Sequence, residues 1–128
     1  MASATVVLIV DDEYSIVETL AEVLAWEGYE VLTASNGAQA LEVMRSRPVG
    51  VVLLDVMMPI LAGPEVLEAM RADPALRAVP VVLMTAAPMA LAELPTDGIT
   101  VLRKPFQVNG LLAALRDATE GAEASQSA

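Results

Sequence analysis

Apolar residues along the chain follow two alternating patterns. Short runs rich in Val and Leu are separated by longer segments in which apolar residues recur every three or four positions. Apolar runs without regular polar alternation are typical of strands that are covered on both faces of a parallel sheet. The predicted strands are residues 5–10, 29–34, 49–54, 80–84 and 99–102.

The segments between these strands predict amphipathic helices. Apolar residues recur at helical spacing from Ile16 to Leu24, and Gly28 follows where a helix C-cap is expected. Further helices are expected at residues 38–47, from 64 to about 73, and from 108 to about 119.

Strands that alternate with helices predict an α/β fold with an open parallel sheet and helices on both of its faces. The chain of 128 residues is long enough for one domain, which we expect to span residues 1–119. Residues 120–128 are small and polar and are predicted to form a flexible tail. Because ligands of such sheets bind at the carboxyl ends of the strands, the residues there are candidates for a site.

Composition narrows the chemistry that the chain can supply. It contains no Cys and no His, which excludes disulfides, thiol chemistry and an imidazole base from its own residues. A formal charge of −10 disfavours nucleic acid and anionic lipid and favours divalent cations or basic protein surfaces. The apolar runs are too short to cross a membrane and the first residues do not resemble a signal peptide, so we expect a cytoplasmic protein.

Polar residues stand at four of the predicted strand ends. Asp11 and Asp12 follow the first strand, Asp55 the third, Thr85 the fourth and the single lysine, Lys104, the fifth. If these strands are neighbours, three carboxylates, a hydroxyl and an ammonium share one edge of the sheet. Clustered carboxylates repel one another and favour a hard cation, which points to Mg²⁺, with Mn²⁺ as the alternative.

Each of these residues also has a structural explanation when it is taken alone. Asp12 can cap the following helix, Thr85 can be an ordinary hydroxyl at a strand end, and Lys104 with Pro105 can form a turn. Helix capping explains Asp55 less well, because the next helix is expected to begin eight residues further on. The combination at successive strand ends favours a functional site.

The chain resembles the receiver domain of two-component response regulators over residues 5–119. The matching motifs, in order, are Val10-Asp11-Asp12-Glu13, Leu53-Leu54-Asp55-Val56-Met57-Met58-Pro59, Met84-Thr85-Ala86 and Lys104-Pro105-Phe106. This resemblance implies a flavodoxin-like sheet with the strand order 2-1-3-4-5. It also implies a stand-alone signalling protein similar to chemotaxis regulators.

The resemblance implies a role for each site residue. Asp55 would accept a phosphoryl group, Lys104 would contact a phosphoryl oxygen, and Thr85 would act as the switch hydroxyl. Such a protein catalyses only its own phosphorylation and dephosphorylation and is not otherwise an enzyme. A cis peptide bond is expected before Pro105. The expected ligands of Mg²⁺ are Asp11, Asp12, Asp55 and the backbone carbonyl of Met57.

The expected partners are proteins. A histidine kinase or a histidine phosphotransfer protein would supply the phosphoryl group, because this chain has no His. A downstream protein target would receive the signal from a monomer or weak dimer. By resemblance, the donor would dock on the first helix and on the loop after Lys104, although Ile16 and Phe106 suit core packing equally well. The candidate docking residues are Tyr14, Ser15, Ile16, Thr19, Pro105 and Phe106.

Two departures from the family pattern concern output. Val101 stands three residues before Lys104, where an aromatic residue is usual, and eighteen residues separate Thr85 from Lys104. The short spacing leaves room for a short or irregular fourth helix, at about residues 89–94. Three alternatives remain: a receiver-like scaffold, a receiver domain taken from a larger regulator or hybrid kinase, and an aspartate-nucleophile phosphatase, whose motif the first pair of aspartates fits poorly.

Overall fold

The elements of the fold follow one another in the order that the sequence predicts. The computed structural model describes residues 5–56, 63–86 and 99–127, so the short helix expected at 89–94 lies outside the described residues. The elements are β1 (Val6–Val10), α1 (Tyr14–Trp26), β2 (Glu30–Ala34), α2 (Gly37–Ser46), β3 (Val51–Asp55), α3 (Gly63–Ala72), β4 (Val81–Thr85), β5 (Thr100–Arg103) and α4 (Val108–Ser127).

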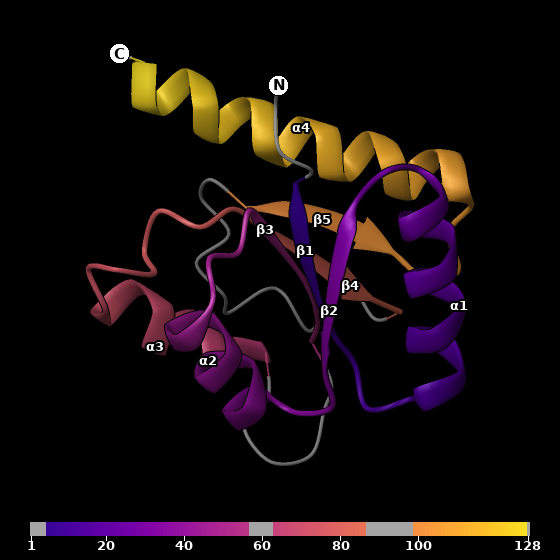
Figure 1. The fold of residues 1–128 in the computed structure, drawn as a ribbon, viewed down its shortest axis with the longest axis horizontal. Helices are drawn as coiled ribbons and strands as arrows, with labels where there is room; N and C mark the ends of the chain where they lie inside the picture. Colours follow the sequence, from indigo (N-terminus) through magenta and orange to yellow (C-terminus); the bar gives the residue numbers. More distant parts are fainter. Residues whose placement is uncertain (1–4, 57–62, 87–98, 128) are drawn as a thin grey trace.

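The strands form one parallel sheet in the order β2-β1-β3-β4-β5 (Figure 1). This confirms both the fold class and the strand order. Every residue of β3 and β4 is buried, whereas the edge strands β2 and β5 are partly exposed. Their position at the edges explains why the apolar pattern is least continuous in these two strands.

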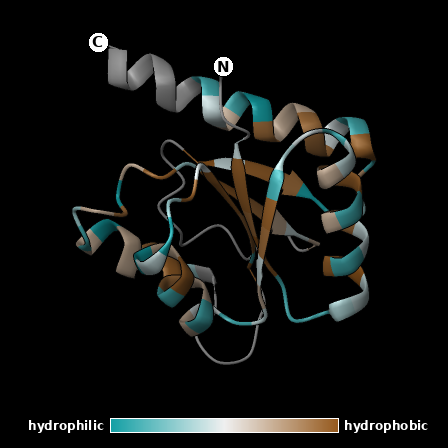
Figure 2. Cartoon of the chain, viewed as in Figure 1, coloured by the Kyte–Doolittle hydropathy of each residue, from teal (hydrophilic) through white to brown (hydrophobic). Residues whose placement is uncertain are grey.

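Helices cover both faces of the sheet, with α1 and α4 on one side and α2 and α3 on the other (Figure 1). Successive side chains of a strand alternate between these layers. Leu54 therefore packs with the α2 and α3 residues, and its neighbour Leu53 packs with those of α1 and α4. Figure 2 shows that the central strands are hydrophobic along their length, while the helices also carry hydrophilic residues.

Local sequence signals set several helix ends. Gly28, just after α1, has a φ of 96°, a conformation that glycine adopts without strain. At the start of α2, Asn36 Oδ1 accepts a hydrogen bond from the amide of Gln39 at 2.9 Å.

The last helix is longer than expected. α4 continues to Ser127, although its end was predicted near Thr119. Residues 120–127 contain Ala, Glu and Gln and no proline, so no residue there forces the helix to stop. The flexibility of residues 120–128 stays a prediction. None of the described helices combines the length and the apolar character that a membrane span requires.

Candidate functional site

Four of the predicted site residues meet at the carboxyl edge of the sheet. Asp11 directly follows β1 and Lys104 directly follows β5. Asp55 and Thr85 were expected after their strands but are the last residues of β3 and β4, because Asp55 still pairs with Met84 and Thr85 with Arg103. This pairing fixes the backbone beneath both functional side chains.

Lys104 joins the two buried carboxylates. Its Nζ lies 3.3 Å from Asp11 Oδ2 and 3.5 Å from Asp55 Oδ2. Asp11 is 1% exposed and Asp55 is 5% exposed. Burial of the ammonium lowers the pKa of Lys104, but the charges of Asp55 and Asp11 and their hydrogen bonds raise it, and the net pKa lies above the ordinary value. Lys104 is therefore a cation at neutral pH.

The two oxygens of Asp11 have different partners. Oδ2 accepts from Lys104, while Oδ1 accepts a hydrogen bond from the backbone amide of Glu13 at 3.0 Å. The amide of Asp11 in turn donates to the carbonyl of Ala34 at 3.2 Å. These contacts hold the turn between β1 and α1 and orient the carboxylate. This role of Glu13 was not predicted from the sequence, although aspartate side chains commonly accept a hydrogen bond from the backbone amide two residues further on.

Asp12 completes a group of carboxylates that could hold a metal ion. One oxygen from each of Asp11, Asp12 and Asp55 lies within 4.8 Å of the other two, and Asp12 itself is exposed. Three carboxylate oxygens, one of them on the exposed side chain of Asp12, are a donor set that fits Mg²⁺ or Mn²⁺, which keep several water ligands. Met57, the fourth expected ligand, lies outside the described residues.

Thr85 lies beside Lys104 but is almost fully buried. Thr85 is 1% exposed, and its backbone carbonyl accepts a hydrogen bond from the amide of Lys104 at 2.8 Å. The peptide bond between Lys104 and Pro105 is cis, as the resemblance implied. Val101 pairs with Leu83 and is 37% exposed, so it stands on an open part of β5.

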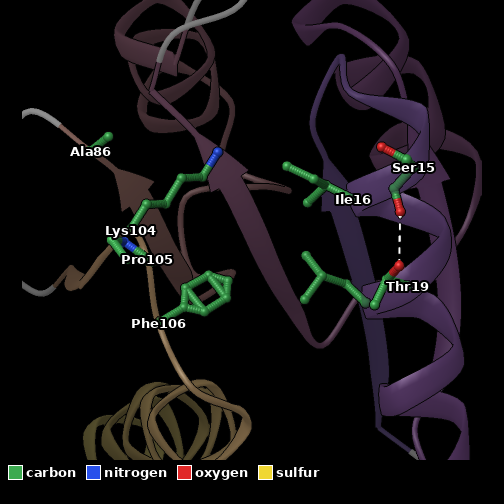
Figure 3. Close-up of a pocket in the computed structure, with 8 residues that line it drawn as sticks. Ser15, Ile16, Thr19, Ala86, Lys104, Pro105 and Phe106 are labelled. Carbon is green, nitrogen blue, oxygen red and sulfur yellow. Dashed lines mark hydrogen bonds between the residues drawn. The ribbon is translucent and has the colours of Figure 1, made fainter.

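A groove of about 560 Å³ opens next to Lys104 (Figure 3). Ile16 projects from α1 toward Lys104 and Phe106 on the opposite wall. Five of the six candidate docking residues line this groove. Leu20 and Ala86 also line it and were not predicted, although Leu20 follows Ile16 by one helical turn. The lining residues are Ser15, Ile16, Thr19, Leu20, Ala86, Lys104, Pro105 and Phe106.

Tyr14 is the candidate docking residue that does not line this groove. It lines a separate hollow of about 240 Å³ together with Asp11, Asp12 and Gln39. Tyr14 therefore borders the carboxylate group on the side of β2, away from Phe106.

Comparison with known proteins identifies the family. The family model described as response regulator receiver domain matches residues 7–116, which include all the site residues named above. The chain belongs to this receiver domain family. The resemblance stated from the sequence motifs is thereby confirmed.

Solved and curated relatives agree with this membership. Chemotaxis protein CheY4 of Vibrio cholerae has a TM-score of 0.83 and 33% sequence identity, over 91% of this chain and 99% of that one. The probable transcriptional regulatory protein TcrX of Mycobacterium tuberculosis is 36% identical over 114 residues, covering 86% of this chain and 47% of TcrX. YkoG of Bacillus subtilis is 37% identical over 115 residues, covering 88% and 50%.

The receiver domain spans about half the length of these curated relatives, whose names describe transcriptional regulators. The family is a signalling domain of two-component systems and not a classical enzyme. In this chain, the clustered carboxylates of Asp11, Asp12 and Asp55 have the composition expected of the acidic pocket in which receiver domains bind Mg²⁺.

Proposed function

We propose that this receiver domain is a Mg²⁺-dependent phosphoacceptor that takes a phosphoryl group from a phosphohistidine partner onto Asp55. It then signals through a conformational change and protein contact. Asp11, Asp12, Asp55 and the carbonyl of Met57 would bind the cation. The partner is a histidine kinase or a histidine phosphotransfer protein, and the proposed setting is the cytoplasm, as a monomer or weak dimer.

One observation carries this proposal. Asp55 is 5% exposed at the carboxyl edge of the sheet, with the Lys104 ammonium 3.5 Å from its Oδ2 and the carboxylates of Asp11 and Asp12 close by. A buried carboxylate that only stabilised the fold would need no adjacent group of like charge, which costs free energy. The arrangement suits a nucleophile whose reaction brings an additional anion and a cation into the site.

The chain's own residues divide the work of the transfer. An oxygen of Asp55 forms a bond to phosphorus while the P–N bond to the partner's histidine breaks. The electron pair of the P–N bond returns to the imidazole nitrogen. Lys104 lies close enough to turn from the carboxylates to a phosphoryl oxygen, and its compact ammonium suits that exchange. Mg²⁺ bound by the aspartates would neutralise charge on the transferring oxygens.

The groove beside Lys104 supports a protein as the donor. It is lined mainly by apolar side chains, and Lys104 belongs both to its wall and to the ion pair with Asp55. The side chain of Lys104 alone would separate a group bound in this groove from Asp55. An apolar groove of this kind suits side chains of a partner protein better than a small phosphorylated metabolite.

The curated relatives favour a second setting for the same chemistry. Because the chain spans about half of proteins named as transcriptional regulators, the receiver could also act within a longer regulator. CheY4 is matched over 99% of its chain and favours the stand-alone form. The intact mass of the protein purified from its source cells distinguishes the two settings.

Amide NMR in the presence of Mg²⁺ and beryllofluoride, a phosphoryl mimic, tests the proposed function. We expect shifts at Asp55, Thr85 and Lys104 that require both additives and that are absent in Asp55→Asn. Shifts that persist in Asp55→Asn, or an unchanged spectrum of the unmodified protein, would overturn the phosphoacceptor role.

A further inference from the structure

A small pocket opens at the amino ends of β4 and β5, at the opposite end of the sheet from Asp55. Its volume is about 90 Å³. Val81 is the first residue of β4 and Ile99 directly precedes β5, whereas Thr85 ends β4 about 13 Å further along the strand. The pocket is therefore separate from the clustered carboxylates and from the groove beside Lys104. Its apolar lining residues are Leu67, Met70, Val79, Val81 and Ile99.

Two arginines, Arg71 and Arg77, complete the lining of this pocket. Among the described residues that line it, none is acidic. The chain has seven basic residues and seventeen acidic ones, so two guanidinium groups that share one pocket without a carboxylate are an unexpected distribution. Like charges in a small space repel one another. The pocket thus carries a positive charge that an anion would balance.

Local structure explains Arg71 but not Arg77. Arg71 lies in the last turn of α3, where the helix dipole stabilises a cation. Arg77 lies between α3 and β4, is exposed, and forms no ion pair with any residue that the structure describes. The acid nearest to it in sequence is Asp73, whose Oδ2 pairs with Arg45 Nε at 3.5 Å and whose Oδ1 accepts from the amide of Ala75 at 2.9 Å. The guanidinium of Arg77 is therefore available to a ligand.

The apolar lining sets the size and the shape of that ligand. Leu67, Met70 and Val81 are almost fully buried, so they form a fixed wall. A cavity of about 150 Å³ holds one benzene molecule, so a pocket of about 90 Å³ has room for about four carbon atoms. A carboxylate matches the planar donors of a guanidinium, and a short branched chain matches the wall. A bare inorganic anion would leave the apolar wall without a partner.

We propose that this pocket binds a small aliphatic carboxylate. Its branched chain packs against Val81 and Ile99, and its two oxygens accept hydrogen bonds from Arg77 and Arg71. Two sources offer this chemistry: a free short-chain acid and the carboxyl-terminal residue of another protein. This ligand goes beyond the proposed function and does not depend on it.

Methyl NMR with small probe molecules tests the pocket. Isobutyrate supplies a branched chain and a charge, isobutyramide the same shape without the charge, and inorganic phosphate a charge without the chain. Isobutyrate should shift the Cδ1 methyl resonance of Ile99 with a millimolar dissociation constant, while that of Ile9, buried in the core beneath α1 and α4, stays unchanged. Isobutyramide and phosphate should each bind about tenfold more weakly.

Two arginine variants separate the pocket from general attraction of an anion. Arg77→Gln should weaken isobutyrate binding about tenfold, because hydrogen bonds from a charged donor are lost. Arg77 is exposed, so its replacement leaves the core intact. Arg116→Gln is the matched control, because it removes an exposed arginine of α4 that does not line the pocket. This control should bind isobutyrate within about twofold of the unmodified chain, since distant exposed charges are screened.

N-acetylvaline, which presents a chain terminus with an isopropyl side chain, distinguishes the two sources. Tighter binding than that of isobutyrate supports the terminus of a partner protein, and weaker binding supports a free acid. An Ile99 methyl resonance that responds to neither compound would overturn the site. Isobutyramide binding as tightly as isobutyrate, or Arg77→Gln binding as tightly as Arg116→Gln, would overturn the assignment to a carboxylate.

Discussion

At the scale of single residues, Lys104 holds the site together. The ammonium holds two buried carboxylates whose oxygens lie 3.3 and 3.5 Å away. Composition could identify this residue as the single lysine, and the motif could place it at a strand end. Neither could show that Asp11 divides its two oxygens between Lys104 and the Glu13 amide, because that depends on how the turn after β1 closes.

Lys104→Ala should destabilise the protein when no divalent cation is present. Two buried carboxylates would lose their shared cation, so the free energy of unfolding should fall by about 2 kcal/mol. Added Mg²⁺ should recover part of this loss and bind more tightly than to the unmodified chain, because the ammonium no longer competes for the same oxygens. Urea unfolding with and without Mg²⁺ measures both effects.

Arg47→Ala is the matched control for this prediction. Arg47 also forms an ion pair at 3.3 Å, with Glu30, but both side chains are more than half exposed. Its loss should cost less than about 1 kcal/mol and should not depend on Mg²⁺. Equal losses in the two variants would contradict the role given to burial at Lys104.

At the scale of elements, strand ends and helix ends were predictable to different degrees. The apolar runs located each strand in the described part of the chain. They did not show that Asp55 and Thr85 remain paired within the sheet, because a polar residue marks the end of an apolar pattern. Pro64 correctly indicated the start of α3. The predicted end of α4, near Thr119, was wrong, because small polar residues near a chain terminus suggest a frayed end even where the helix continues.

The start of α2 offers a test of local structure. Asn36 Oδ1 accepts from the Gln39 amide, and Gln39 Oε1 accepts from the Ser35 amide at 2.7 Å. Asn36→Ala should therefore lower the free energy of unfolding by about 1 kcal/mol. Ser46→Ala, at the other end of α2, removes an exposed hydroxyl that bonds to carbonyls of the helix and should change stability by less than about 0.5 kcal/mol. Chemical denaturation measures the free energy of unfolding of both variants. An Asn36→Ala variant as stable as the unmodified protein would contradict the assigned capping hydrogen bond.

At the scale of the whole molecule, the strand order brings the site together. Residues as distant in sequence as Asp11 and Lys104 meet because β1, β3, β4 and β5 are neighbours with parallel directions. The alternation of strands and helices predicts such a sheet but leaves its order open, and the order came from the resemblance to a family. The groove depends on how α1 lies against the loop after β5, so Ala86 could not be found from sequence spacing, whereas Leu20 could have been, because it follows Ile16 by one helical turn.

Phosphorylation of Asp55 and its dependence on Mg²⁺ can be measured on the intact protein. The most direct measurement is intact-protein mass spectrometry after incubation with acetyl phosphate, with peptide mapping of the modified residue. We expect one phosphoryl group per chain, located on Asp55, which forms in the presence of Mg²⁺ and does not form when the metal is chelated or when Asp55 is replaced by Asn. An unmodified mass in the presence of Mg²⁺, or equal modification of Asp55→Asn, would contradict this expectation.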